Sequence, residues 1–202
     1  MIASLLTLTY ADAIALKLTD SYSIHRTVYD LFEDIRTDSQ KCSSVSSGFL
    51  YVDKGGEISN RHILILSNRP PKQPTYGLLK SHTVPETFLS HERYQFELVI
   101  NPTKRESKTG KTIAIRGRGA IAEWFIGKAP SSWGFSVNAN TLRVEDVSVQ
   151  KFNKSHGRVT LASAKLIGEL IVVDKDKFVR SFREGIGRGR AFGFGLLQIV
   201  PL

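Results

Sequence analysis

The sequence predicts an α+β fold of two tandem ferredoxin-like (RRM-like) domains with antiparallel sheets. The 202 residues suffice for two units of about 100 residues, each of which can bury a modest core. Segments that alternate apolar and polar side chains, the period of half-buried strands, occur in both halves and flank segments of helical periodicity. Each half runs strand, helix, strand, strand, an optional helix and strand, which is the ferredoxin-like order. We therefore predict one domain over residues 1–90 and a second over residues 91–202.

The first domain begins with a strand and a capped helix. Leu6 and Leu8 alternate with threonines, which indicates a strand with one buried face. Asp20 is a suitable N-cap, and apolar residues recur after it at helical spacing. Two strands joined by a glycine turn follow, and three prolines after them restrict the chain to short elements. The predicted elements are a strand at 4–10, a helix from Asp20 to residue 34, and strands at 48–53, 62–67 and 76–84.

The second domain repeats this order and adds a basic hairpin and a glycine-rich loop. Every second residue from Tyr94 to Ile100 is large and apolar, which predicts a strand. A turn at Gly110 places a protruding hairpin within residues 102–117. Phe178 and Phe182 lie four residues apart, as on the buried face of a helix. The predicted elements are strands at 94–100, 143–152, 158–173 and 196–200, and helices at 120–128 and 174–183.

The net charge of +9 and the isoelectric point near 9.7 indicate a polyanionic partner. Solubility alone is the alternative explanation, but clustering of the charge favours phosphate binding. An acidic membrane surface is disfavoured because neither cluster forms a strongly amphipathic helix. The clusters comprise Lys104, Arg105, Lys108, Lys111, Arg116 and Arg118, and then Arg180, Arg183, Arg188 and Arg190.

Side chains that bind metals or form disulfides are few. Cys42 is the only cysteine, which excludes a disulfide framework and a thiolate zinc site, and we interpret it as a loop residue. The histidines without metal-ligand spacing are predicted to be structural or exposed; they are His62, His82, His91 and His156. We expect no metal and no cofactor. The chain lacks an apolar run of bilayer length, and its first ten residues lack signal-peptide features, so we expect a cytoplasmic protein.

A glycine-rich loop lies between the last helix and the last strand. Its five glycines in eleven residues exceed the one or two that a tight turn needs, and they permit positive φ and exposed N–H groups. Two arginines add charge-assisted contacts to phosphate, whereas Phe192 and Phe194 suit either base stacking or the core. The spacing differs from dinucleotide and P-loop fingerprints. The loop residues assigned to binding are Gly185, Gly187, Arg188, Gly189, Arg190, Gly193 and Gly195.

The glycine-rich loop and the residues after it resemble those of a known family. The glycine pattern, followed by the ending Gly-Leu-Leu-Gln-Ile-Val-Pro-Leu at 195–202, is similar to the repeat-associated RNA-binding superfamily of CRISPR systems and to its CasE branch, the processing nuclease of Cascade complexes. Residues 21–26 (Ser-Tyr-Ser-Ile-His-Arg) resemble the catalytic first helix of that branch, and residues 96–105 and 143–147 resemble two of its strands. The resemblance covers nearly the whole chain and implies two ferredoxin-like domains.

The resemblance implies a metal-independent endoribonuclease for precursor crRNA. In this family the RNA 2′-OH attacks the adjacent phosphorus and leaves 2′,3′-cyclic phosphate and 5′-OH ends. Tyr22 and His25 lie side by side at i, i+3 on the predicted helix, so His25 is assigned to proton transfer and Tyr22 to positioning or proton transfer. Family members commonly use a lysine as the cation; the helix has none near His25, and Arg26 is the local substitute. The cations of residues 104–118 would hold the stem of the repeat hairpin, and other Cascade subunits are expected partners.

Alternatives remain open from the sequence alone. A single histidine on a helix is usually a structural or surface residue, and a non-catalytic RNA-binding subunit of the same superfamily would need no His25. An unrelated nucleotide-binding enzyme is disfavoured because its fingerprints are missing. Trp124 and Trp133 are predicted to lie in the core rather than to stack on bases.

Overall fold

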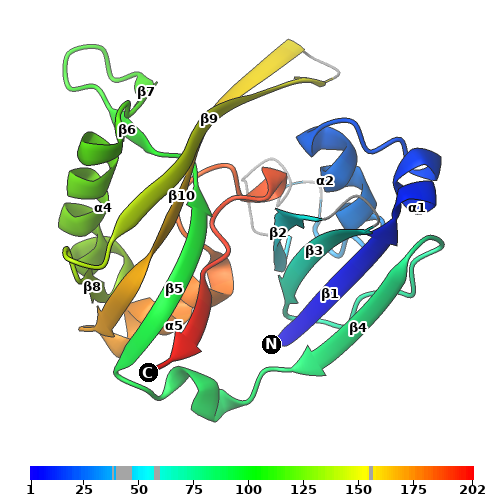
Figure 1. Ribbon diagram of the computed structural model, residues 1–202, viewed down its shortest axis with the longest axis horizontal. Helices are drawn as coiled ribbons and strands as arrows, with labels where there is room; N and C mark the ends of the chain where they lie inside the picture. The colour runs from blue at the N-terminus through cyan, green and yellow to red at the C-terminus, as the bar shows by residue number, and fades with distance from the viewer. Residues whose placement is uncertain (38, 40–46, 57–59, 155–156) are drawn as a thin grey trace.

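The computed structural model of the chain describes residues 1–37, 39, 47–56, 60–154 and 157–202. Cys42 and His156 lie outside the described residues, as do residues 57–59 next to the predicted Gly55-Gly56 turn. The described elements form two large sheets with helices packed against them and one separate two-stranded hairpin (Figure 1). Both sheets are antiparallel, as expected.

The first sheet has the strand order β2-β3-β1-β4. Its strands are β1 (Ile2–Thr9), β2 (Phe49–Gly55), β3 (Asn60–Ser67) and β4 (Leu78–Thr83). Helices α1 (Tyr10–Ala15) and α2 (Ser21–Tyr29) connect β1 to β2. The first strand lies between the third and the fourth, which is the split β-α-β arrangement of a ferredoxin-like unit. A short 3-10 turn, η1 (Glu86–Leu89), leads from β4 to the second sheet.

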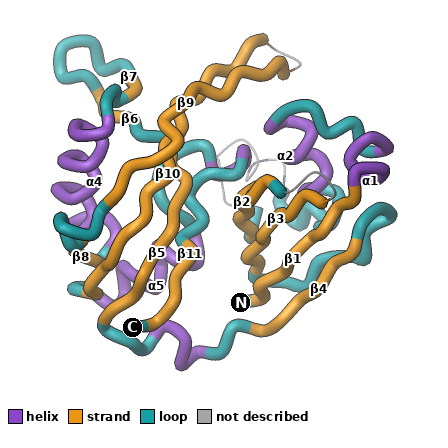
Figure 2. Tube along the Cα trace, in the orientation of Figure 1, coloured by secondary structure: helices purple, strands orange, loops and turns teal. Residues whose placement is uncertain are grey.

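The second sheet has the order β11-β5-β10-β8, and β9 also pairs with β10. Its strands are β5 (Arg93–Ile100), β8 (Phe135–Val137), β9 (Arg143–Lys154), β10 (Gly157–Val172) and β11 (Gln198–Pro201). The hairpin of β6 (Thr103–Arg105) and β7 (Thr112–Ala114) protrudes from it. Helices α4 (Arg118–Trp133) and α5 (Lys175–Glu184) and the 3-10 turn η2 (Arg190–Phe192) complete this half (Figure 2).

Several predicted boundaries are wrong for identifiable reasons. The first strand stops at Thr9, because Thr9 and Asp12 form a capping box that starts the unpredicted helix α1. Helix α2 ends at Tyr29 rather than near residue 34. Helix α4 extends to Trp133 although it contains Pro130, whose missing N–H removes one i→i−4 hydrogen bond from the last turn. The three-residue strand β8 is too short to give a periodic pattern and was not predicted.

Apolar packing joins the two sheets. The larger core surrounds the second sheet and contains Phe96, Phe125 and Phe178, but it also includes Leu50 and Leu66 from the first sheet. A polar connection accompanies it, since Lys54 of β2 donates hydrogen bonds to side chains of β5 and β11. The two sheets therefore hold a fixed relation to each other, and that relation sets the geometry of the site described next.

Candidate functional site

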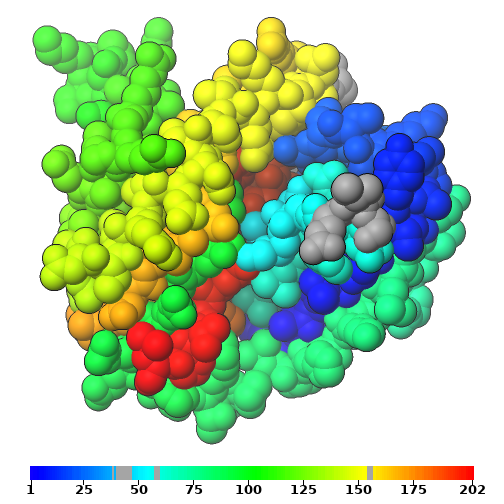
Figure 3. Space-filling view, viewed as in Figure 1, coloured from blue at the N-terminus to red at the C-terminus, as the bar shows by residue number. Residues whose placement is uncertain are grey.

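Helix α2 brings the predicted catalytic residues to the junction of the two sheets. Its N-cap Asp20 accepts a hydrogen bond from Ser23 N at 2.8 Å, and Ser23 Oγ accepts one from Asp20 N at 3.1 Å, which fixes the first turn. The same turn contacts β9, because Ser21 Oγ donates a hydrogen bond to Gln150 Oε1 at 2.8 Å. In Figure 3 the glycine-rich loop is seen in a recess between β9 and the elements of the first sheet.

His25 is oriented by the glycine-rich loop. Its Nδ1 lies 2.6 Å from the carbonyl oxygen of Ala191 in η2. A carbonyl oxygen can only accept, so Nδ1 carries the hydrogen and a neutral His25 has its basic lone pair on Nε2. The hydroxyl of Tyr51 donates to the same carbonyl at 3.0 Å, and burial is the main cause that raises the pKa of this tyrosine. Ala191 therefore sets the His25 tautomer.

An aromatic cluster surrounds the imidazole. The Tyr22 ring stacks beside His25 with centroids 5.7 Å apart, and Tyr29 and Phe192 lie 4.1 and 5.4 Å from it. Phe152 of β9 lies parallel to Tyr22 at 6.3 Å. The cluster confirms that Tyr22 and His25 share one helix face. Phe152 was not predicted as a site residue, and Phe192 was assigned only to base stacking or the core, because the approach of both rings to this cluster depends on the tertiary fold.

Arg26 lies on the solvent side of this cluster. Its guanidinium carbon is 5.6 Å from the centroid of the Tyr22 ring, within the range of a cation–π contact. The side chain is exposed, so the folded protein does not pay the free-energy cost of burying its charge away from water. The guanidinium is therefore accessible to a phosphate. Arg26, Tyr22 and His25 are thus neighbours, as the helix pattern predicts.

The glycine-rich loop needs its glycines for its own shape. All five have positive φ, between 77° and 85°. Ile186 N donates to the Gly195 carbonyl at 2.8 Å, which closes the loop, and Gly195 N donates to Val99 O at 2.8 Å, which attaches it to β5. A Cβ on Gly195 would lie 2.4 Å from the Ile186 carbonyl oxygen. The glycines therefore allow the compact path that carries Ala191 to His25.

The predicted phosphate-binding residues separate into groups. Lys104, Arg105, Gly187 and Arg188 come together around one cavity of about 490 Å³. Lys108 and Lys111 lie exposed on the β6–β7 hairpin and its turn. Arg116 is exposed just before α4, and Arg118 lines a different hollow with Arg143. Arg190 donates to the Glu184 carbonyl at 2.7 Å and so stabilises the end of α5.

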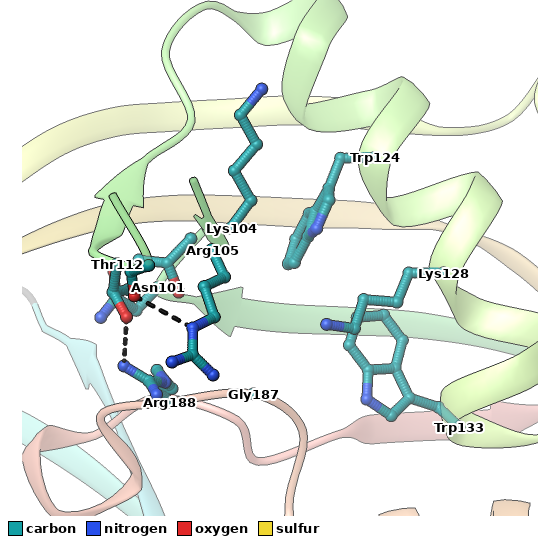
Figure 4. Close-up of a pocket in the computed structure, with 11 residues that line it drawn as sticks. Asn101, Lys104, Arg105, Thr112, Trp124, Lys128, Trp133, Gly187 and Arg188 are labelled. Atoms are coloured by element: carbon teal, nitrogen blue, oxygen red, sulfur yellow. Dashed lines mark hydrogen bonds between the residues drawn. The ribbon is translucent and has the colours of Figure 1, made fainter. Parts of the chain in front are cut away.

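The cavity also contains residues that the sequence did not assign to binding. Asn101, Trp124 and Lys128 line it together with the predicted cations (Figure 4). Trp133 is buried as predicted, whereas Trp124 is only half-buried. Phe194 is fully buried, which places it in the core and not on a base-stacking surface.

The part of the chain that the structure describes holds neither a cluster of metal ligands nor a helix that could span a membrane. Among residues 1–37, 39, 47–56, 60–154 and 157–202, no group of three or more His, Cys, Asp or Glu side chains is arranged to hold a metal ion. Within the same ranges, each helix is too short or too polar for a bilayer crossing.

The sequence matches the family described as CRISPR associated protein over residues 3–201, nearly the whole chain. The chain belongs to this family of CRISPR-associated proteins. Among curated proteins, this CRISPR-associated protein is 29% identical over 120 residues to the CRISPR-associated endoribonuclease Cse3 of Thermus thermophilus. That alignment covers 54% of the chain and 56% of Cse3, so it spans about half the length of each protein.

Solved structures show that the fold of this CRISPR-associated protein is that of its relatives. CRISPR endoribonuclease Cse3 bound to a 19-nucleotide RNA aligns over 100% of both chains with a TM-score of 0.81 and 20% identity. Cas6e from Escherichia coli K-12 aligns over 100% of both chains with a TM-score of 0.73 and 18% identity. A chain of a CRISPR RNA-guided surveillance complex aligns over the same extent with a TM-score of 0.71 and 18% identity.

Proposed function

We propose that the chain is a metal-independent endoribonuclease that binds a CRISPR repeat hairpin and cleaves precursor crRNA. The observation that carries the proposal is the pair of Tyr22 and His25, with the His25 tautomer set by the Ala191 carbonyl. The names of the relatives support it, since Cse3 is an endoribonuclease with RNA-bound structures. We place the catalytic helix in a domain of residues 1–90 and most RNA contacts in a domain of residues 91–202.

The RNA supplies the nucleophile in the proposed reaction. His25 Nε2 removes the proton of the 2′-OH as the oxygen attacks the adjacent phosphorus, or in the reverse assignment the protonated ring donates to the leaving oxygen. The bond from phosphorus to O5′ breaks, and O5′ takes up a proton. The products are a 2′,3′-cyclic phosphate and a 5′-OH end. Tyr22 positions the imidazole or transfers the second proton, and Arg26 stabilises the charge on the phosphorane.

RNA binding rests on the basic hairpin and the loop. The six cations of residues 104–118 are exposed and suit the phosphates of an A-form stem, which proteins read by shape and backbone. The loop glycines from Gly185 to Gly195 let its backbone pass close to RNA, and Arg188 adds charge. A relative lies in an RNA-guided surveillance complex, so we propose that this chain keeps its product as a Cascade subunit in the cytoplasm.

The decisive experiment uses His25→Ala with His82→Ala as a matched control, since His82 is an exposed histidine on β4 of the first sheet. Loss of the proton-transfer group should slow single-turnover cleavage by about 10²–10⁴-fold while hairpin affinity stays within several-fold. His82→Ala should cleave like the wild type. Wild-type cleavage by His25→Ala would refute the role given to His25, whereas hairpin binding without cleavage by the wild type would leave the rival, a non-catalytic RNA-binding subunit.

A second substrate tests the nucleophile. A hairpin with one 2′-deoxy sugar immediately 5′ of the scissile phosphate should bind normally and resist cleavage. The unmodified hairpin should be cleaved equally well with and without excess chelator. Cleavage of the deoxy hairpin, or inhibition by the chelator, would instead indicate a water nucleophile activated by a metal.

A further inference from the structure

A cationic cavity lies between the β6–β7 hairpin, helix α4 and the glycine-rich loop (Figure 4). Its volume of about 490 Å³ is within the range of small-molecule sites, about 300–1,000 Å³. Its eleven described lining residues include four cations and no carboxylate. The four are Lys104, Arg105, Lys128 and Arg188. A double-stranded stem is too wide to enter a cavity of this size, whereas one nucleotide fits.

The two guanidinium groups are held in place before any ligand binds. Arg105 Nε donates to the Gly110 carbonyl at 3.0 Å, and Arg188 Nη1 donates to Thr112 Oγ1 at 2.9 Å. Both acceptors belong to one short segment of the hairpin, so the two groups converge on it. Each guanidinium keeps further N–H donors in its planar fork, which suits the oxygens of a phosphate. Because the two arginine side chains are already fixed, binding a phosphate costs less side-chain entropy.

Trp124 supplies an aromatic surface in the same cavity. It projects from α4 toward the strand that carries Lys104 and Arg105 (Figure 4), and it is half-buried. Lys128 Nζ lies 5.6 Å from the centre of its ring, and the buried Trp133 supports it edge-on at 5.9 Å. Proteins bind single-stranded nucleic acids with such a combination of an aromatic ring and nearby cations. A base stacks on the ring, and the cations contact a phosphate.

Asn101 points independently to a ligand. It lines the cavity, is only 6% exposed, and its Oδ1 has no hydrogen-bond partner in the structure. A buried acceptor without a donor is costly, and a ligand with an N–H group would relieve that cost. Nucleobases carry N–H donors, whereas sulfate and the phosphodiester groups of RNA carry no hydrogen to donate.

We propose that this cavity binds one unpaired nucleotide of the RNA. The base stacks on Trp124 and donates to Asn101 Oδ1, and Arg105 and Arg188 hold its phosphate. Loop residues 187 and 188 line the cavity while Ala191, three residues further on, contacts His25. The same loop therefore connects the nucleotide to the scissile site. This inference rests on the proposed function for the identity of the RNA, but the cavity can be tested without cleavage.

The tryptophans provide a direct readout, because the chain has only two and both line the cavity. Titration with AMP should quench tryptophan fluorescence in a saturable manner, since the base contacts the Trp124 ring. Inorganic phosphate should compete with AMP but cause little quenching alone. Absence of saturable quenching by AMP would overturn the proposal. An equal response to phosphate and AMP would also overturn it, because the cavity would then be a simple anion site.

Binding assays with RNA test the same contact. A repeat hairpin carrying a run of unpaired adenosines at each end is compared with the blunt hairpin, and the ratio of their affinities is the measured quantity. Trp124→Leu should reduce this ratio by about 5-fold to about 150-fold, the range of base–aromatic stacking. Lys128→Ala, an exposed change that leaves the core intact, should reduce the ratio too and carries the test if Trp124→Leu fails to fold.

Lys80→Ala is the matched control, since Lys80 is an exposed lysine on β4 of the first sheet. It should leave the ratio unchanged. An unchanged ratio in Lys128→Ala and in a folded Trp124→Leu would overturn the proposal. Failure of the nuclease proposal has a different signature, because His25→Ala would then cleave normally while AMP still quenches the wild-type protein.

Discussion

Substitution of Gly195 by alanine tests whether the glycine-rich loop is a built scaffold for His25. Gly195 has φ +83°, and an added Cβ would meet the Ile186 carbonyl oxygen at 2.4 Å. Left-handed φ costs an L-residue about 1–2 kcal/mol. Relief of the clash must also move residue 195 away from residue 186. That movement weakens the hydrogen bond between them, which contributes about 1 kcal/mol to stability. The total loss is therefore about 2–3 kcal/mol.

For a chain of this size the loss lowers Tm by roughly 4–12 °C, which scanning fluorimetry or circular dichroism can measure. Cleavage at a temperature where the variant is folded should also fall, because a displaced loop moves the Ala191 carbonyl away from His25. RNA affinity should change less than the cleavage rate. The two readouts together separate a local scaffold defect from global unfolding.

Gly127→Ala is the control with the opposite sign. Gly127 lies inside α4, and its added Cβ would have no neighbour within 4 Å. Alanine in a helix interior is more stable than glycine by about 0.5–1 kcal/mol, so Tm should rise slightly and cleavage should persist. The reasoning would be refuted if Gly195→Ala matched the wild type in Tm, or if both glycine variants shifted Tm in the same direction.

Two further predictions concern charge. Replacing Lys104, Arg105 and Lys108 by glutamine should weaken hairpin binding and reduce the slope of log K against log salt by about one unit for each lost phosphate contact; an unchanged slope would place the stem elsewhere. Burial raises the pKa of Glu97, but the hydrogen bond and charge of Lys54, together with the charge of Lys165 and the hydrogen bond of Gln198, lower the pKa overall. Stabilisation by this carboxylate is thus present above its unfolded pKa and lost as pH falls through the lower folded value, so Glu97→Gln should reduce Tm at neutral pH and little in strong acid.

The sequence predicts most of the fold because each half of the chain contains strong local signals. Period-two alternation from Tyr94 to Ile100 matches β5, and the Asp20 and Asp174 caps mark the starts of α2 and α5. The signals fail where an element is short or where tertiary packing sets its end. Strand β8 has three residues, too few for a period, so long-range pairing alone establishes it.

The sequence predicted which side chains of the candidate site lie together, but it did not predict the backbone group that contacts them. Tyr22, His25 and Arg26 are visible as a spacing on one helix. The Ala191 carbonyl gives no sequence signal, because every residue has one and only the loop's path brings this one to His25. Asn101 was not assigned to binding for a similar reason. In the sequence it is a polar residue after a strand, and only the folded cavity shows that its Oδ1 has no hydrogen-bond partner.

The proposed catalysis depends on both sheets, because the contacts that orient His25 come from both. His25 lies on α2 of the first sheet, and its acceptor Ala191 lies in the loop of the second. Tyr51 of β2 donates to the same carbonyl, so the first sheet also orders the loop that orients its histidine. Separation of the sheets would leave Tyr22 and His25 adjacent on their helix and yet remove the Ala191 carbonyl from His25 Nδ1. The proposed proton transfer therefore depends on the docked arrangement, which the shared apolar core and the Lys54 hydrogen bonds maintain.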